Sequence, residues 1–393
     1  MDARPHHQQP TAASQLRRSA RSQRTLPSTY DGTSTASSVA SSKKTKKNPV
    51  AGEEDFRARV FPRYGIVLQH GQTVLLSPYQ YFKTEDPRKV APEMTLTEWY
   101  QQNHPDCHSW LELPREPGET EVIRTQLARV LKQEANEAKL SLRAKMYFFK
   151  EDILPPKSNP SRYSCTGYMV ETHPNPDGDK LLAPPAVGEG LEHAFLGNPD
   201  LTWFNTLMSF HEEYRQLIHN EVPVHFESDA IAPFFTIEFK KKHKDEKEAV
   251  DQMAAAVTLN VYNRYLQRLR RLQVWGAPFA AEQFADLDYF GCTYCGESVQ
   301  IFRARPRLSF ETPSNGDSIW QGCEIATIHR FRTNENGQIM LFASWINEII
   351  NYGIGKYKEN FTLDVKGILH QREGGERVSL VPEELQRLSA HQP

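Results

Sequence analysis

The chain has no long apolar run. None of its segments approaches the roughly 18 consecutive apolar residues that a helix needs to span a bilayer. The first residues are rich in arginine and glutamine, and they lack the apolar core that a secretory signal carries. We therefore expect a protein that does not associate with membranes and that is intracellular.

Cysteine is scarce, since the 393 residues include only five: Cys107, Cys165, Cys292, Cys295 and Cys323. An odd number of cysteines without a secretory signal favours reduced thiols over a disulfide framework. Cys292 and Cys295 form a CxxC pair that could complete a zinc site with Cys323 and His329. The second close pair of a strong zinc motif is missing, so we favour the interpretation that these thiols are small buried apolar groups.

Apolar residues make up only 38% of the chain, and the deficit is concentrated in residues 1–50. This segment carries nine lysines and arginines against two aspartates, and its Ser, Thr, Gln and Ala show no apolar periodicity. Such a composition predicts a disordered basic arm. The cluster of Lys43, Lys44, Lys46 and Lys47 is interpreted as a nuclear-import signal, although short basic runs also occur as ordinary solvated charge.

The residues that suggest a chemistry lie on the strand-like run 233–240. Side chains alternate between the two faces of a strand, so Glu238 and Lys240 share one face while phenylalanine and isoleucine occupy the other. Asp229 could bring a second carboxylate beside Glu238 from the neighbouring strand of a hairpin. Two carboxylates supply hard oxygen ligands, and an ammonium stabilises charge that develops on a phosphoryl group. The pattern therefore predicts a magnesium-dependent phosphodiesterase site.

The spacing Asp229-x8-Glu238-x-Lys240 resembles the active-site motif of the PD-(D/E)XK nuclease superfamily. The run Pro-Phe-Phe-Thr-Ile-Glu-Phe-Lys-Lys, followed by a helix that bears Ala and Gln, is similar to uncharacterised nuclease-like domains of many fungal proteins. The resemblance covers roughly residues 55–370, with one departure: Ser228, not proline, precedes Asp229. It implies an α/β fold with a mixed sheet flanked by helices, a nucleic-acid substrate, and Mg²⁺ or Mn²⁺ held by Asp229 and Glu238.

Three more residues follow from the resemblance. Similar domains often carry a glutamine on the helix after the motif strand, which implies that Gln252 lies near the metal; the alternative is an exposed polar residue. Glu212 or Glu213 would match an acid that some relatives carry on their first helix. Domains of this kind also include inactive members. The alternative function is therefore a catalytically silent module that binds proteins or acts as a scaffold.

The charge balance of the body bears on this choice. Residues 51–393 hold 38 basic and 47 acidic residues, a net charge of −9. A protein that grips duplex DNA usually shows a basic footprint, because phosphate neutralisation dominates its affinity. The acidic balance therefore counts against tight DNA binding and favours the silent module. The basic run 240–244 and Arg264, Arg268, Arg270 and Arg271 could still bind a phosphate, or could be ordinary solvated charge.

Hydrophobic periodicity and turn residues predict the elements of this domain. We expect helices over 95–103, 119–149, 201–220, 245–273 and 345–352, and strands over 222–229, 233–241, 299–305 and 323–331. Residues 154–200 are expected to be irregular, and Asn336-Gly337 predicts a hairpin turn. The sequence thus divides into a basic arm, 1–50, a nuclease-like domain with an N-terminal helical extension, 55–370, and a polar tail, 371–393.

Overall fold

The structure is a computed structural model that describes residues 55–69, 76–94, 96–103, 117–132, 137–148, 165–168, 181–195, 199–207, 210, 215–216, 218, 230–242, 245–277, 279–310 and 319–372. The basic arm, with the lysine cluster at 43–47, lies outside these ranges, as does 373–393. The nuclear-import signal therefore stays a prediction.

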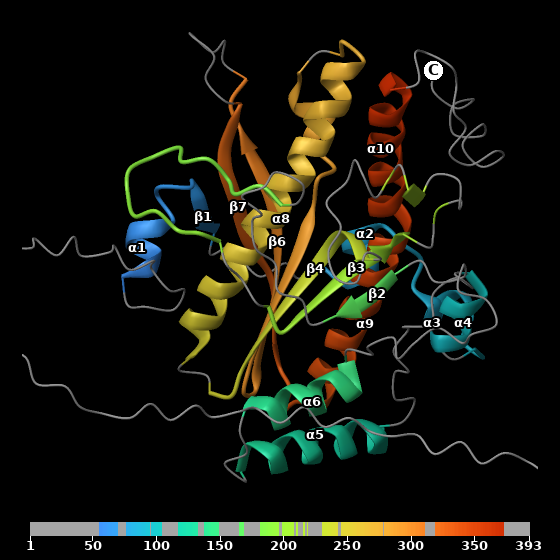
Figure 1. The fold of residues 1–393 in the computed structure, drawn as a ribbon. Helices are drawn as coiled ribbons and strands as arrows, with labels where there is room; N and C mark the ends of the chain where they lie inside the picture. The colour runs from blue at the N-terminus through green and yellow to red at the C-terminus, as the bar shows by residue number, and fades with distance from the viewer. Residues whose placement is uncertain are drawn as a thin grey trace, which may run out of the picture. The chain divides into compact units, whose positions relative to one another are not determined.

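Seven strands form one mixed sheet in the order β1-β7-β6-β5-β4-β3-β2 (Figure 1). The strands are β1 (Ile66–Gln69), β2 (Cys165–Tyr168), β3 (Leu201–Thr206), β4 (Ala230–Lys240), β5 (Tyr289–Cys295), β6 (Ser298–Leu308) and β7 (Trp320–Arg332). The central strand β4 runs antiparallel to β3 and parallel to β5. The predicted α/β class, a mixed sheet flanked by helices, is confirmed.

The helices that precede β4 in the sequence are α1 (Phe56–Val60), α2 (Pro78–Phe82), α3 (Pro87–Val90), α4 (Leu96–Asn103), α5 (Pro117–Lys132) and α6 (Glu137–Phe148). Those after it are α8 (Glu246–Val274), a 3₁₀ turn (Ala281–Phe284), α9 (Asn336–Tyr352), a π-helical turn (Gly353–Tyr357) and α10 (Lys358–Arg372). None of the helices in the described ranges is long and apolar enough to cross a membrane.

Helix α8 connects the parallel strands β4 and β5 and crosses the sheet between them, as Figure 1 shows. Its alanine-rich middle is buried, as the sequence predicted, and small side chains allow a close approach to the strands. At Gly291 of β5 the helix packs tightly, because a Cβ there would lie 2.4 Å from Sδ of Met253. The apolar side chains of β4 and of α5, α6 and α9 form the core on the opposite face.

Strand β4 is buried along almost its whole length, which explains why its sequence is nearly continuously apolar. The prediction that Pro233 begins the strand is wrong, because the strand already begins at Ala230. The pairing register with β3 shifts beside Pro233, and Ala232 adopts a positive φ of 49°. A β-bulge accommodates a proline inside a strand, since no regular ladder donor is then lost.

The helix predicted over 201–220 is wrong at its start, because Leu201–Thr206 is strand β3. All six of its residues are buried, so the apolar side chains that fit a helical stripe instead fill both faces of a strand. Short apolar runs fit either period, and the aromatic and β-branched residues here favour the strand. The strand predicted over 222–229 lies outside the described residues.

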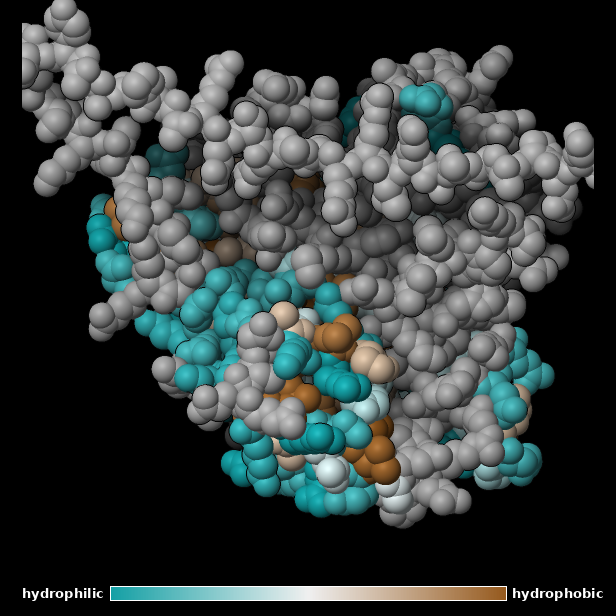
Figure 2. Space-filling model, turned by 60° about the horizontal axis from the view of Figure 1, so that its bottom comes forward, coloured by the Kyte–Doolittle hydropathy of each residue, from teal (hydrophilic) through white to brown (hydrophobic). Residues whose placement is uncertain are grey.

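Three other predictions need correction. The segment predicted as one helix over 119–149 forms two, α5 and α6, and a short strand, β2, lies within 154–200. Asn336-Gly337 does not form a hairpin turn but begins α9, which is buried at Ile339 and at every position from Phe342 to Ile350. Figure 2 shows the face on which α5 and α6 lie, where apolar residues are scattered among hydrophilic ones.

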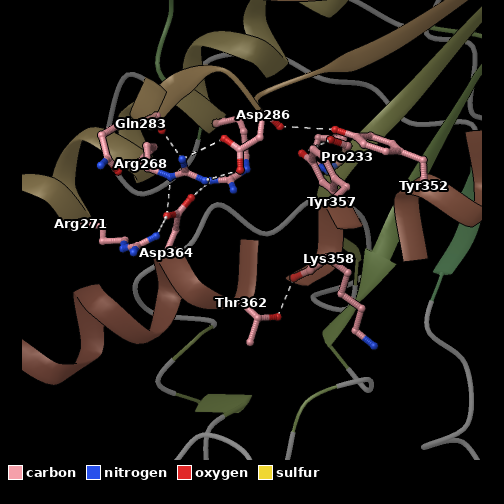
Figure 3. Close-up of polar contacts among 11 residues, drawn as sticks. Pro233, Arg268, Arg271, Gln283, Asp286, Tyr352, Tyr357, Lys358, Thr362 and Asp364 are labelled. Carbon is pink, nitrogen blue, oxygen red and sulfur yellow. Dashed lines mark hydrogen bonds and ion pairs between the residues drawn. The ribbon is translucent and has the colours of Figure 1, made fainter. Parts of the chain in front are cut away.

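A buried ion-pair network fixes α10 against α8 (Figure 3). Asp364 accepts hydrogen bonds from Arg268 Nε at 2.6 Å and from Arg271 at 3.1 Å, and it also pairs with Arg264. Burial alone would raise the pKa of Asp364, but Arg264 and Arg268 lower it below its usual value. These three arginines, which the sequence offered as phosphate ligands, therefore neutralise a buried carboxylate.

We expect Asp364→Asn to lower the free energy of unfolding by about 3–5 kcal/mol, because removing one partner leaves buried charge unpaired. The measurement is urea denaturation at pH 7. Asp55→Asn is the control, since the pair of Asp55 with Arg59 is exposed and its loss should leave the midpoint unchanged. Equal midpoints for Asp364→Asn and the wild type would show that the network contributes nothing to stability.

Candidate functional site

The candidate site lies at the C-terminal end of β4, where Glu238 and Lys240 face α8. Thr236 on the same face lies 2.7 Å from the hydroxyl of Tyr289, which also accepts a hydrogen bond from Asn260 of α8 at 3.0 Å. These polar contacts connect β4 and β5 to α8 on the face of the sheet that the helix covers. Glu238 is only 4% exposed, so its carboxyl group is held away from bulk water.

Asp229, the predicted partner of Glu238, lies outside the described residues, so that pairing stays a prediction. The structure instead places Asp200 beside Glu238. Asp200 directly precedes β3, whose first residue pairs with Ile237, and its Oδ2 accepts a hydrogen bond from the backbone N–H of Phe239 at 2.7 Å. The antiparallel pairing of β3 and β4 thus brings an acid that is 38 positions away in the sequence to the end of the motif strand.

The sequence did contain a signal for Asp200. Pro199 precedes it, so this acid stands in the Pro-Asp dipeptide that is missing at Ser228 and Asp229. The signal was missed because residues 201–206 were predicted to be helical, which leaves no strand to place Asp200 beside β4.

Burial raises the pKa of Glu238 well above its usual value, and repulsion from the Asp200 carboxylate raises it further. The nearby ammonium of Lys240 acts in the opposite direction but does not outweigh these effects. Burial and the neighbouring Asp200 carboxylate thus both disfavour the ionised form of Glu238. A cation bound between the two carboxylates would remove that penalty.

Lys240 lies within a ring of carboxylates. Its Nζ is 3.5 Å from Glu248 of α8 and 3.7 Å from Glu137 of α6. Burial alone would lower the pKa of Lys240, but the carboxylates of Glu137, Glu248, Glu238 and Asp200 together raise it. Lys240 is therefore held as an ammonium, which can donate hydrogen bonds but cannot serve as a base near neutral pH.

Gln252 belongs to the same cluster through Glu248. Its Nε2 donates a hydrogen bond to Oε1 of Glu248 at 3.2 Å, and the same oxygen faces Lys240. Glu212 and Glu213 lie outside the described residues, so whether either reaches the site stays a prediction. Glu137, which the sequence did not single out, contributes a carboxylate from a helix ahead of the motif strands.

Other buried acids show how this cluster differs from a structural one. Asp251 accepts hydrogen bonds from Arg57, and Glu348 accepts them from Tyr100 and, at 2.6 Å, from Thr84. Asp364 is neutralised by three arginines. Each of these acids faces donors or cations, whereas the largest effect of any neighbour on Glu238 is repulsion from another acid. Perturbed acids of this kind cluster at functional sites.

The donor set of the cluster fits a hard divalent cation. Within the described ranges, no three His, Cys, Asp or Glu side chains are arranged to hold a metal ion together. A pair of carboxylates is nevertheless sufficient for Mg²⁺, which keeps several water ligands and is commonly bound by one or two carboxylates together with substrate phosphates. Asp200 and Glu238 provide such a pair.

The zinc interpretation does not agree with where the thiols lie. Cys292 belongs to the core cluster on one face of the sheet, and Cys323 belongs to the cluster on the other face, so the two cannot join in one coordination sphere. Burial raises the pKa of Cys292, and it raises those of Cys295 and Cys323 to about 12. All three are neutral thiols packed as apolar side chains, which agrees with the preferred interpretation.

Comparisons with known proteins provide no further guidance. A scan against protein-family models matches no family, and searches of the curated proteins and of the solved structures find no match. The chemistry of the site is therefore inferred from its own geometry.

The raised pKa of Glu238 makes stability depend on pH. The carboxyl group of Glu238 has its usual pKa near 4.5 in the unfolded chain and a higher pKa in the folded protein, so folding takes up a proton between these two pH values. The stability that the neutral carboxyl contributes is therefore complete below pH 4.5, and it is lost as the pH rises through the folded pKa. In EDTA at pH 8 we expect Glu238→Gln to be more stable than the wild type by about 1–3 kcal/mol. The difference should vanish toward pH 4.

Thermal denaturation of both proteins from pH 4 to pH 8 tests this expectation. Glu282→Gln is the control, because Glu282 is exposed and its replacement should change neither the stability nor its pH dependence. A Glu238→Gln protein that is less stable than the wild type at pH 8 would show that the ionised carboxylate stabilises the fold.

Proposed function

We propose that this protein is a metal-dependent phosphodiesterase of the PD-(D/E)XK type that acts on nucleic acid. The observation that carries the proposal is the cluster of Asp200, buried Glu238 and Lys240 at the paired ends of β3 and β4. The proposal assigns Pro199-Asp200, rather than Ser228-Asp229, as the first part of the motif. Glu238 and Lys240 keep the roles that the sequence suggested.

Asp200 and Glu238 would hold Mg²⁺ or Mn²⁺ through their carboxylate oxygens. Such an ion, when bound, supplies Lewis-acid polarisation of a phosphodiester and lowers the pKa of water. Glu238 lies on β4, and Asp200 directly precedes β3 and accepts a hydrogen bond from the backbone N–H of Phe239, so the pairing of β3 with β4 holds the two acids together. Rigid placement of this kind favours catalysis, because little reorganisation is then needed during the reaction.

Lys240 has the electrostatic role in this proposal. Its ammonium would donate hydrogen bonds to the attacking water or to a non-bridging oxygen of the phosphodiester, where negative charge grows during the displacement. Glu137 and Glu248 hold its Nζ at the mouth of the cluster, and Gln252 in turn fixes Glu248. We assign Glu137, Glu248 and Gln252 as positioning residues.

The alternative is a catalytically silent module that binds proteins or acts as a scaffold. Its support is the net charge of −9 over residues 51–393 and the burial of Glu238 beneath α8. A silent module and an enzyme differ in two measurable properties, the binding of Mn²⁺ and metal-dependent cleavage.

The first test is cleavage by the purified full chain. We expect it to cut DNA or RNA with Mg²⁺ or Mn²⁺ and not in EDTA. Asp200→Asn, Glu238→Gln and Lys240→Ala should each reduce the rate by at least about 100-fold, the scale for loss of one preorganised electrostatic group. Asp229→Asn is the matched comparison. If Asp229→Asn retains activity and Asp200→Asn loses it, Asp200 is the acid of the motif. If Asp200→Asn retains activity and Asp229→Asn loses it, the acid is Asp229.

Isothermal titration with Mn²⁺ provides a readout that is independent of activity. The wild type should bind the ion, and Asp200→Asn and Glu238→Gln should bind it at least about tenfold more weakly. A wild-type protein that neither binds Mn²⁺ nor cleaves nucleic acid would support the silent module. Cleavage that persists in Glu238→Gln would identify a contaminating nuclease or a different site.

A further inference from the structure

A large cavity opens next to the candidate site. Its volume is about 870 Å³, and it lies among the end of β4, the start of α8, the hairpin between β5 and β6, and the end of β7. Its charged lining consists of Lys241, Lys242, Arg330, Arg332, Glu246 and Glu297. We call this cavity the basic pocket, because four cations outnumber two acids in a body whose overall charge is −9.

The four cations of the basic pocket are free to bind a ligand. Within the described part of the chain, no ion pair, hydrogen bond or ring contact engages the side chain of Lys241, Lys242, Arg330 or Arg332. The acids, by contrast, already have partners: Glu246 accepts a hydrogen bond from Gln300, and Glu297 accepts one from Asn334 at 2.9 Å. The pocket therefore offers positive charge that the fold itself does not neutralise.

This pattern differs from that of three arginines on α8. Arg264, Arg268 and Arg271 are all engaged by Asp364, so they contribute to folding rather than to binding. The side chains of the four pocket cations have no such carboxylate partner among the described residues. Such a lining suits an anionic ligand.

The basic pocket and the candidate site are contiguous. Lys241 follows Lys240 directly, and the backbone oxygen of Lys240 accepts a hydrogen bond from the N–H of Gly296, which lines the pocket, at 3.0 Å. A second cavity of about 180 Å³ shares Glu246 and Arg330 with the first. The two adjoining cavities provide room for more than one anionic group of an extended chain.

We propose that the basic pocket binds the phosphodiester backbone of the nucleic-acid strand that the site cleaves, at phosphates next to the scissile one. This inference rests on the proposed function and adds to it the surface that positions the substrate. The guanidinium groups of Arg330 and Arg332 match the planar geometry of phosphate oxygens, and the ammonium groups of Lys241 and Lys242 add charge. Because its contacts are to the backbone, this surface selects for charge and not for base sequence.

The test is fluorescence anisotropy with a fluorescein-labelled 20-nucleotide single strand, as DNA and as RNA, and with the matching DNA duplex. Measurements are made in EDTA, so that binding is observed without cleavage. The test variant combines Lys242→Ala, Arg330→Ala and Arg332→Ala, and leaves the less exposed Lys241 intact. The control combines Lys83→Ala, Lys89→Ala and Lys356→Ala, exposed residues outside the pocket's lining, and removes the same charge.

We expect the wild type to bind at least one of these strands with a dissociation constant between about 1 and 100 µM, the range of non-specific contacts. The pocket variant should bind about tenfold more weakly, and its slope of log affinity against log salt should fall by about 2 for a single strand, since each lost phosphate contact contributes about 0.7. The control variant should bind as the wild type does. Unchanged circular dichroism and melting temperature would show that the variants fold.

The outcomes separate this inference from the proposed function. If the pocket variant binds as tightly as the control, or if the wild type binds none of the probes, the inference is overturned even where the protein cleaves. If the pocket binds the strand but no metal-dependent cleavage occurs, the proposed function fails while the pocket stands as a nucleic-acid surface. An acidic peptide, 20-residue polyglutamate, that displaces the strand at equal charge and binds more tightly would also overturn the assignment to nucleic acid.

Discussion

The packing of α8 across β4 and β5 is the contact on which the other features depend. The helix connects two parallel strands, so it must lie on one face of the sheet, and its small side chains with Gly291 let it lie close. Its first turns then bring Glu248 and Gln252 over Lys240, while its last turns bring three arginines to Asp364. The packing of α8 on the sheet thus positions the candidate site at the N-terminal end of the helix and fixes α10 near its C-terminal end.

Placing the carboxyl groups of Asp200 and Glu238 together lowers the stability of the folded protein, and the packing of α8 offsets this cost. Elsewhere in the described core, buried carboxylates meet arginines or hydroxyl donors, as Asp364 and Glu348 do. Glu238 is also buried but lies beside Asp200; burial raises its pKa well above the usual value, and repulsion from Asp200 raises it further. Two acids placed together below a buried helix cost stability unless a cation joins them. Such a cost is more easily understood for a binding site than for a structural contact.

The parts of the fold with one strong periodicity were predictable from the sequence. Apart from the early start of β4, strand β4 and helix α8 are where their patterns place them. The apolar residues of β4 alternate with Thr236, Glu238 and Lys240, and α8 has an all-round apolar stretch. Strand β3 was missed because its apolar residues do not alternate with polar ones, and Trp203 fits a helical stripe with Leu207 and Phe210. The misplacement of β3 also hid Asp200, whose contact with β4 depends on strand pairing across 38 positions.

Charge explains why the basic pocket and the candidate site belong together. A phosphodiester that approaches Glu137, Asp200, Glu238 and Glu248 meets four carboxylates and a single ammonium, so a strand would be repelled from the cluster by itself. A divalent ion offsets part of this charge, and the unpaired lysines and arginines of the adjacent pocket can offset more at neighbouring phosphates. The proposed phosphodiesterase activity is compatible with a net negative charge of the body, because the positive charge that it needs is confined to one cavity. Long-range attraction of duplex DNA is then not required. Under the proposed function, the same arrangement would leave affinity low and would place the strand where Lys240 can reach it.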